Sequence, residues 1–375
     1  MIIDTFISSL GLSKPFFAGV PDSQLKPFCN YLAQEYGINE NHIIAANEGN
    51  AVALAAGHYL ATGDIPVVYL QNSGLGNAVN PITSLLNDKV YGIPTIFIIG
   101  WRGEPGLKDE PQHVFQGEIS KELCELLNLE VMVLDKETTA AEVADKVKNF
   151  QGQFNQGKSL AFLVKKGAFE DTVKANYQNN YELVREDIVE KVVEVADEDI
   201  IVSTTGKASR ELFEIREAKK QSHKYDFLTV GSMGHSSSIA LAIAQNKKDT
   251  KVWCIDGDGA ALMHLGAFAL TGSSKPNNLV HILIDNSAHE TVGGMPTVSE
   301  DIDFVKIAKA CGYPSATSVT SIEELEKALK EAKTLNELTL IEVKASLASR
   351  ADLGRPTTTA KENKEAFMDN LKKLS

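Results

Sequence analysis

Long apolar runs, positive charge and paired cysteines are all scarce in this sequence of 375 residues. No apolar run approaches the roughly 18 residues that a membrane-spanning helix needs. Lys and Arg number 37 against 50 Asp and Glu, which gives a formal net charge of −13. So acidic a surface argues against sequence-independent binding to nucleic acid or anionic lipid, because both need clustered cations. We therefore expect no nucleic-acid partner and no membrane partner.

The four cysteines, at positions 29, 124, 254 and 311, are far apart in the sequence and form no CxxC pair. This spacing excludes a zinc ribbon and argues against a disulfide framework. No basic residue precedes Lys14, so the first residues do not have the pattern of a secretory signal. A reduced cytoplasm is the expected location.

Short apolar runs alternate with helix-patterned stretches along almost the whole sequence. Val- and Ile-rich runs of this kind predict parallel sheets that are covered by helices on both faces. The expected strands are 16–20, 67–71, 95–101, 131–135 and 160–164, then 200–203, 227–230, 252–255, 280–284 and 338–343. The expected helices include 49–62, 138–150, 185–196, 236–245, 304–311 and 322–333.

A polar stretch at 166–181 separates the two series of strands and predicts a linker. We therefore expect two domains of the α/β class, each a doubly wound parallel sheet, at 1–170 and 180–375. With 43% hydrophobic residues, the chain can bury a core in each of them.

The turns that follow the expected strands are rich in Gly, Asp, Asn and Ser, and ligands of parallel sheets bind at that edge. Each turn alone is ordinary, but together they indicate an extended anionic ligand. The Gly-rich turn at 257–259 has Leu262 where a dinucleotide fingerprint needs a third Gly, and no P-loop motif occurs. These absences exclude a P-loop NTPase, and they rank a dehydrogenase behind the functions that are considered below.

Two polar side chains stand at the ends of consecutive expected strands. Asp258 follows the first strand, between Gly257 and Gly259, and Asn286 follows the next strand 28 residues later. If the strands are neighbours, a carboxylate and an amide oxygen meet at one edge, as Mg²⁺ requires when phosphate oxygens and water complete its shell. The flanking glycines and the N–H groups of the following helix favour a phosphate.

This combination closely resembles the diphosphate-binding motif of thiamine diphosphate enzymes. The resemblance implies that Asp258 and Asn286 ligate Mg²⁺, with the backbone carbonyl of Ala288 as a third ligand. It also implies that the turn Gly231-Ser232-Met233 contacts the cofactor, with Met233 between the two rings. Without the other motif, Met233 would be read as a core methionine.

Glu48 is a lone carboxylate that opens a stretch otherwise rich in Ala and Val. By its position alone it is a charge that stabilises a helix N-terminus. The segment NEGNAVALAAGHYLATG at 47–63 resembles the glutamate motif of the same enzymes, which implies that Glu48 hydrogen-bonds the aminopyrimidine ring of the cofactor. Asn72 and Gly74, after the strand at 67–71, are further expected cofactor contacts.

Several stretches resemble the phosphonopyruvate decarboxylase family: GVPDS at 19–23, QNSGLGNAVNPITSL at 71–85, WRGEPGLKDEPQHVFQG at 101–117, DNSAHETVGGMPT at 285–297 and SRADLGRP at 349–356. The resemblance covers most of the chain and leaves no room for the middle domain of larger relatives. It implies a carboxy-lyase that converts 3-phosphonopyruvate to phosphonoacetaldehyde and CO₂ in the biosynthesis of phosphonates such as 2-aminoethylphosphonate.

The substrate of such an enzyme carries two anionic groups. Only six arginines occur in the chain, and Arg102, Arg350 and Arg355 lie in loops at strand ends, where a guanidinium could bind a phosphonate. Lys207 is a further candidate. Each of these cations could instead pair with a nearby carboxylate.

Decarboxylation also needs an acid that protonates the carbon from which CO₂ has left. Asp22 is the first candidate for this role and, with Ser23, for a substrate contact. His113 and His289 are the other candidates. Each could instead be structural: Asp22 as a turn residue, His113 as a hydrogen-bonding residue of its loop, and His289 as a residue that shapes the metal loop.

The resemblance further implies a homodimer or larger assembly in which Glu48 and Asp258 come from different copies. Two alternatives stay open: a sulfopyruvate decarboxylase, with the same chemistry on another head group, and a cofactor-holding subunit without catalysis.

Overall fold

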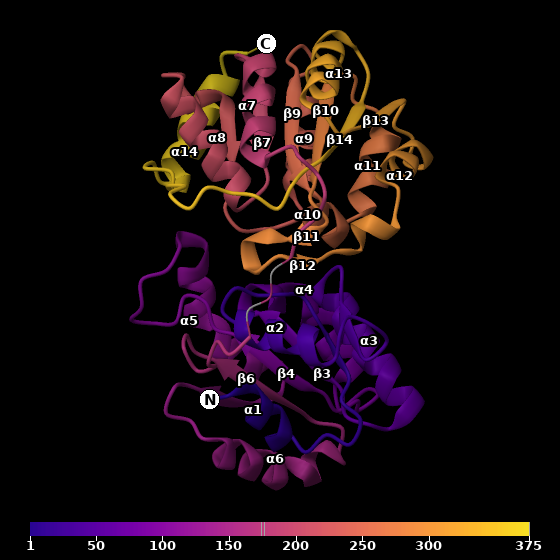
Figure 1. Cartoon of the computed structure of the whole chain (residues 1–375), viewed down its shortest axis with the longest axis vertical. Helices are drawn as coiled ribbons and strands as arrows, with labels where there is room; N and C mark the ends of the chain where they lie inside the picture. Colours follow the sequence, from indigo (N-terminus) through magenta and orange to yellow (C-terminus); the bar gives the residue numbers. More distant parts are fainter. Residues whose placement is uncertain (174, 176, 375) are drawn as a thin grey trace. The chain divides into compact units, whose positions relative to one another are not determined.

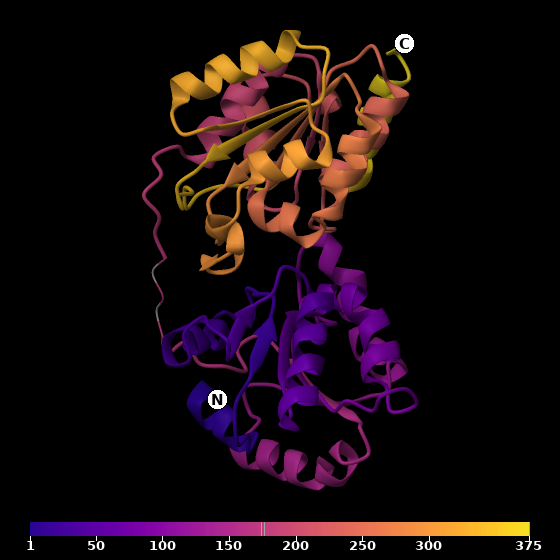
Figure 2. The ribbon, with the colours of Figure 1, turned by 90° about the vertical axis from the view of Figure 1, so that its right-hand side faces the viewer.

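The computed structural model describes residues 1–173, 175 and 177–374, and the chain divides into two compact units, Met1–Asn176 and Tyr177–Ser375. The predicted linker at 166–181 spans this division. Its residues 174 and 176, and residue 375 of the predicted second domain, lie outside the described residues. Figures 1 and 2 show each unit as a sheet with helices packed against it.

The first unit contains a six-stranded sheet in the order β2-β1-β3-β4-β6-β5, with every neighbouring pair parallel. The strands have these bounds: β1 Phe17–Gly19, β2 His42–Ile44, β3 Val67–Gln71, β4 Ile96–Gly100, β5 Leu129–Leu134 and β6 Ser159–Val164. The central strands β3, β4 and β6 are almost wholly buried, as expected for a parallel sheet that is covered on both faces.

Helices cover both faces of this sheet. Helices α1 (Ile3–Ser9), α2 (Lys26–Glu35) and α6 (Ala140–Phe154) pack together on one face, where Phe6 contacts Phe28 and Phe162. Helices α3 (Glu48–Thr62), α4 (Leu75–Asn80) and α5 (Pro111–Leu126) share the second core with Leu70 and Ile99. Two short elements, η1 (Asn72–Gly74) and η2 (Pro81–Leu86), flank α4.

The second unit contains another six-stranded parallel sheet, in the order β13-β14-β10-β9-β7-β8. Its strands are β7 Ile200–Ser203, β8 Asp226–Leu228, β9 Val252–Gly257, β10 Leu279–Asp285, β13 Ser315–Val319 and β14 Thr339–Lys344. A small antiparallel hairpin, β11 (Ala288–His289) with β12 (Met295–Pro296), follows β10. The pairing of β9 with β10 brings the ends of these two strands side by side.

Helices α7 (Arg185–Ala196), α8 (Lys207–Ala218) and α13 (Ile322–Thr334) pack on one face of this sheet, around Trp253 and Ile255. The helices elsewhere in the unit are α9 (Ser236–Asn246), α10 (Asp258–Met263), α11 (Gly266–Ser274), α12 (Phe304–Cys311) and α14 (Ala360–Leu371). Among the described residues, no helix combines the length and the apolar character that crossing a membrane requires.

The prediction of two doubly wound α/β units with parallel sheets is confirmed. The strands that the sequence did not predict are β2 and β13, together with the β11–β12 hairpin. Strand β13 lies at the edge of its sheet, and most of its side chains are half-buried or exposed, so it lacks the apolar run of a central strand.

Candidate active site

In the first unit, Glu48 is the first residue of α3, and its side chain is only 5% exposed. The Asn47 side chain accepts a hydrogen bond from the Asn50 backbone N–H (2.9 Å), which starts the helix at this point. Asn77 Nδ2, on α4, donates to Glu48 Oε2 at 2.7 Å. Gly74 lies so close to the carboxylate that a Cβ atom there would overlap it. A larger residue at position 74 would therefore displace the Glu48 side chain from this position.

Burial raises the pKa of Glu48, although the hydrogen bond from Asn77 opposes the shift. The carboxyl group is therefore closer to sharing a proton at neutral pH than an exposed glutamate is. This is the property that a proton-transferring group needs.

Asn72, which is fully buried, ties together the loops at this edge of the sheet. Its Nδ2 donates to the Arg102 carbonyl and to Ser120 Oγ, both at 2.8 Å, and its Oδ1 accepts from the Arg102 N–H at 3.2 Å. These bonds engage both ends of the amide within the chain. The expected contact of Asn72 with a cofactor stays a prediction.

Asp22 is completely buried and lies against the backbone of Gly100, the last residue of β4. Its Oδ2 accepts a hydrogen bond from the Leu25 N–H at 3.3 Å, while Oδ1 has no partner among the described residues. Burial raises the pKa of Asp22 to about 6, against the opposing effect of backbone hydrogen bonds and the positive charge of Arg102. The group can hold a proton in the neutral range.

Arg102 lies beside Asp22 but is already paired. It forms two hydrogen bonds with Asp109, Nε to Oδ2 at 2.8 Å and Nη2 to Oδ1 at 2.5 Å, and its Nη1 donates to Ser23 Oγ at 2.9 Å. This guanidinium holds the pKa of Asp109 well below its usual range. The structure thus brings Asp22, Ser23 and Arg102 together and adds Asp109, which was not predicted.

His113, on the first turn of α5, is 9% exposed, and its Nδ1 has no partner among the described residues. Burial lowers the pKa of His113 to about 4, and the charge of Arg102 acts in the same direction. The imidazole is therefore neutral at neutral pH and can either donate or accept a hydrogen bond.

In the second unit, Asp258 begins α10 at the end of β9 and is 3% exposed. Burial and, to a smaller extent, the negative charge of Asp285 raise the pKa of Asp258 to about 7. Thr297 Oγ1 donates to Asp258 Oδ2 at 2.6 Å, and the Thr297 N–H donates to the Ser287 carbonyl at 2.9 Å. Thr297 therefore links Asp258 to the turn that carries Asn286.

Asn286 follows β10 directly and is 6% exposed. Its Oδ1 accepts from the Ala288 N–H at 3.2 Å, and its Nδ2 donates to Glu290 Oε2 at 3.0 Å. Ser287 has a positive φ of 56°, a conformation that favours glycine, and its N–H donates to Asp285 Oδ1 at 3.0 Å. The turn from Asp285 to Ala288 is thus fixed by several bonds.

The donor set at this edge suits a hard divalent cation. It combines the buried carboxylate of Asp258, whose pKa is raised by burial and by the charge of Asp285, with the amide oxygen of Asn286 and the carbonyl oxygens of a constrained turn. A cation bound here would offset the burial of Asp258 and favour its ionised form.

Small residues make room beside this site. A Cβ atom at Gly259 would lie 3.4 Å from the His289 ring and 3.4 Å from Met233 Cε, so these two side chains border the glycine. Gly231 and Ser232 both have positive φ, 68° and 46°, and the Gly231 N–H donates to Thr205 Oγ1 at 3.0 Å. Burial lowers the pKa of His289 to about 4. The structure therefore places His289, Met233 and Gly259 together.

Two of the other predicted cations, Lys207 and Arg350, are engaged with carboxylates. Lys207 Nζ lies 2.9 Å from Glu290 Oε1 and 2.7 Å from Ser349 Oγ. Arg350 pairs with Glu186, at 2.9 Å, and with Glu214. Arg355 is exposed in the same loop as Arg350. Lys207 and Arg350 thus form the ion pairs that were the alternative to substrate binding. A contact between either cation and a substrate stays a prediction.

The predicted residues are held in place by four side chains for which no role was predicted: Asn77, Asp109, Thr297 and Arg185. Asn77 and Asp109 lie within the family-like stretches at 71–85 and 101–117, and Thr297 ends the stretch at 285–297. Which side chains they contact depends on the folded loops, so the sequence offered no signal for it.

Two family models match the chain. The N-terminal TPP binding domain of thiamine pyrophosphate enzymes matches residues 14–126, and the C-terminal TPP binding domain matches residues 204–343. The phosphonopyruvate decarboxylase of Streptomyces viridochromogenes is 33% identical over 374 residues, which are 95% of this chain and 91% of that protein. That of Streptomyces hygroscopicus is 32% identical over 98% of this chain and 92% of that protein. The chain belongs to the phosphonopyruvate decarboxylase family of thiamine diphosphate enzymes.

A sulfopyruvate decarboxylase of Methanosarcina acetivorans is 28% identical over 329 residues, 82% of each chain. As a family member, this protein is a decarboxylase that uses thiamine diphosphate. The contacts at Gly259 and the buried Asp258 fit a bound diphosphate and its cation, and the buried Glu48 fits a ring nitrogen.

Proposed function

We propose that this protein decarboxylates 3-phosphonopyruvate to phosphonoacetaldehyde and CO₂, with thiamine diphosphate and Mg²⁺, in phosphonate biosynthesis such as that of 2-aminoethylphosphonate. The observation that carries the proposal is the full-length match to two phosphonopyruvate decarboxylases at 32–33% identity. The group Asp22, Ser23 and Arg102 supports it, because it offers hydrogen-bond donors and an acid beside one another.

Loss of CO₂ leaves an electron pair on the carbon that carried the carboxylate, and thiamine diphosphate supplies the electron-accepting group for it when bound. Glu48 would hold the proton that it exchanges with the aminopyrimidine ring of the cofactor. Asn77 binds its Oε2, so we place that proton at Oε1. Asp22, with a pKa near 6, then donates a proton to the product carbon, and neutral His113 orients the substrate.

Asp258, Asn286 and the carbonyl of Ala288 would hold Mg²⁺, which neutralises the diphosphate and fixes its position. Arg102, together with Ser23, would bind the phosphonate. Because Asp109 occupies two of the five Arg102 donors and Ser23 a third, the substrate must either use the two N–H groups that these bonds leave or displace Asp109. Lys207, Arg350 and Arg355 remain proposed substrate contacts. Lys207 and Arg350 would have to offer a donor beyond their ion pairs or leave their carboxylate partners.

The mechanism also needs Glu48 and Asp258 at one site, and we propose that a second copy of the chain provides one of them. The exposed face of α3 supports this proposal. Asn50, Ala53, Leu54, Gly57 and Leu60 are exposed on it, and Leu60 is 71% exposed. These positions share one side of the helix and carry no charge. An uncharged helix face exposed on an acidic protein is suited to burial against a second copy.

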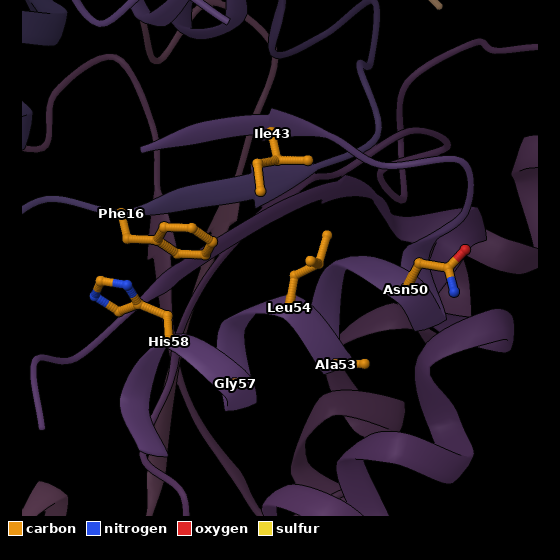
Figure 3. Close-up of a pocket in the computed structure, with 7 residues that line it drawn as sticks. All are labelled: Phe16, Ile43, Asn50, Ala53, Leu54, Gly57 and His58. Atoms are coloured by element: carbon orange, nitrogen blue, oxygen red, sulfur yellow. The ribbon is translucent and has the colours of Figure 1, made fainter. Parts of the chain in front are cut away.

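A hollow of about 690 Å³ lies along the same face. Figure 3 shows Leu54 pointing towards Ile43, with Phe16 and His58 beside them. The rings of Phe16 and His58 stack with their centroids 4.3 Å apart. A hollow and a protruding Leu60 on one face are self-complementary, as a two-fold interface requires.

The decisive assay measures aldehyde release from phosphonopyruvate, sulfopyruvate and pyruvate side by side, with thiamine diphosphate and Mg²⁺. We expect turnover to favour phosphonopyruvate strongly and Glu48→Gln to remove it. The second candidate substrate is sulfopyruvate, because the relative from Methanosarcina acetivorans is named a sulfopyruvate decarboxylase. Preferred turnover of sulfopyruvate would keep the mechanism and overturn the proposed substrate.

A further inference from the structure

Glu290, four residues after Asn286, is the centre of a cluster of ion pairs. Lys207 Nζ lies 2.9 Å from Oε1, and the Arg185 guanidinium contacts Oε2. The Glu290 side chain is 11% exposed. Although burial opposes the shift, these two cations lower the pKa of Glu290. The carboxylate thus stays ionised and accepts hydrogen bonds from several directions.

One of these hydrogen bonds comes from Asn286. Its Nδ2 donates to Glu290 Oε2 at 3.0 Å, while its Oδ1 accepts from the Ala288 N–H at 3.2 Å. The two bonds agree on the orientation of the amide. Turned by 180°, the amide oxygen would face a carboxylate oxygen, and the NH₂ group would face a backbone N–H. Glu290 therefore selects the orientation in which Asn286 Nδ2 faces the carboxylate and Oδ1 faces away from it, towards the Ala288 N–H.

The cluster is itself anchored to two helices. Arg185, at the start of α7, forms two further bonds with Glu211 on α8, from Nε and Nη2, both at 2.8 Å. Arg185 and Glu211 are 7% and 1% exposed. Lys207, at the start of α8, also donates to Ser349 Oγ. Glu290 is thus held by buried partners on rigid elements, which is what a ligand-orienting residue requires.

We propose that Glu290, held by Arg185 and Lys207, is a positioning residue that fixes the Asn286 amide with its oxygen available to the divalent cation. This inference rests on the metal site of the proposed function and deepens it. It also gives Lys207 a role that needs no contact with the substrate. In metal sites, removal of a group that orients a ligand weakens metal affinity by about 10–100-fold.

Glu290→Leu is the informative change. Three donors converge on the carboxylate: Lys207 Nζ on Oε1, and Arg185 Nη1 and Asn286 Nδ2 together on Oε2. A leucine side chain offers no acceptor, so the Asn286 amide loses the partner that sets its orientation. We expect the dissociation constant for Mn²⁺, measured by electron paramagnetic resonance of the free ion with saturating thiamine diphosphate, to rise about 10–100-fold.

The matched control is Asp199→Asn, which breaks another partly buried ion pair of the same unit, with Lys333 at 2.6 Å. It should leave Mn²⁺ affinity at the wild-type value. Circular dichroism of each variant without cofactor reports whether the fold is retained.

A double-mutant cycle with Asn286→Asp separates orientation from charge. Both oxygens of an aspartate are ligand atoms, so orientation no longer matters and Glu290→Leu should cause no further loss. An equal loss in that background would mean that Glu290 acts by its charge, which overturns the inference. If Asn286→Asp binds no Mn²⁺, Glu290→Asp decides, because it keeps the charge but is one methylene shorter. Reduced affinity of Glu290→Asp supports orientation, and wild-type affinity overturns it.

The two proposals fail in different ways. Unchanged Mn²⁺ affinity in Glu290→Leu, with wild-type protein binding Mn²⁺ normally, would overturn this inference alone. Wild-type protein that binds no Mn²⁺ beside thiamine diphosphate would instead remove the proposed metal site.

Discussion

The buried carboxyl of Asp22 makes a pH-dependent contribution to stability that can be worked out from its surroundings. Burial raises its pKa from 3.8 to about 6, so the folded state binds the proton more tightly than the unfolded state does. The group therefore stabilises the fold below pH 3.8, and that contribution is lost as the pH rises towards 6. At 1.36 kcal/mol per pKa unit, the full difference is about 3 kcal/mol. About 2 kcal/mol of it falls between pH 4.5 and 7.5.

Asp22→Asn removes this proton equilibrium and keeps the size of the side chain. We expect the free energy of unfolding of the variant to increase by about 2 kcal/mol relative to that of wild type between pH 4.5 and pH 7.5, because only wild type loses the contribution of Asp22. Any constant cost of the amide, such as an unpaired NH₂ group at the position of the unpaired Oδ1, cancels in this comparison.

The assay is urea unfolding of the cofactor-free protein at a series of pH values, with wild type and variant measured together. Glu137→Gln, which removes a carboxylate at an exposed side chain, is the matched control. A stability difference between Asp22→Asn and wild type that stays constant from pH 4.5 to 7.5 would refute the reasoning. It would show that Asp22 is not the buried, proton-binding group described above.

Three further changes test the two halves of the site and the proposed interface. Gly74→Ala places a methyl group against the Glu48 carboxylate, so we expect a loss of decarboxylase activity that exceeds any loss of thermal stability. Equal activity would show that Glu48 is free to move. Removal of divalent cations with a chelator should abolish activity and the thermal stabilisation by thiamine diphosphate, and Asp258→Asn should reproduce both effects; stabilisation that survives chelation would contradict the metal site. Leu60→Glu on the exposed face of α3 should shift the protein towards monomers in light scattering and lower its activity, whereas an unchanged assembly would exclude this face as the interface.

The sheets were largely predictable because their strands are buried on both faces. A strand such as β10, with seven buried residues, must be apolar along its whole length, and such a run can be recognised without any knowledge of its neighbours. Edge strands are the opposite case. Strand β13 alternates small polar residues with few apolar ones, so only its pairing with β14 makes it a strand.

The chemistry of the site divides in the same way. The position of Asp258 and Asn286 at one edge of the sheet could be predicted, because each directly follows a recognisable strand and adjacent parallel strands end at one edge. The partners of these residues come from loops whose paths no local pattern determines. Thr297 reaches Asp258 across 39 positions, and Glu290 pairs with Arg185 across 105.

The cations show why this difference matters for function. Position at a strand end correctly indicates where Lys207 and Arg350 lie, but it says nothing about which carboxylates they contact. In an acidic chain with 50 carboxylates against 37 cations, a cation near the site is more readily paired than free. Arg102 follows the same rule, since Asp109 holds it in two hydrogen bonds. If a phosphonate binds Arg102 as proposed, it either uses the donors outside the pair with Asp109 or competes with Asp109, so we expect discrimination between anionic head groups to depend on that pair as well as on the arginine itself.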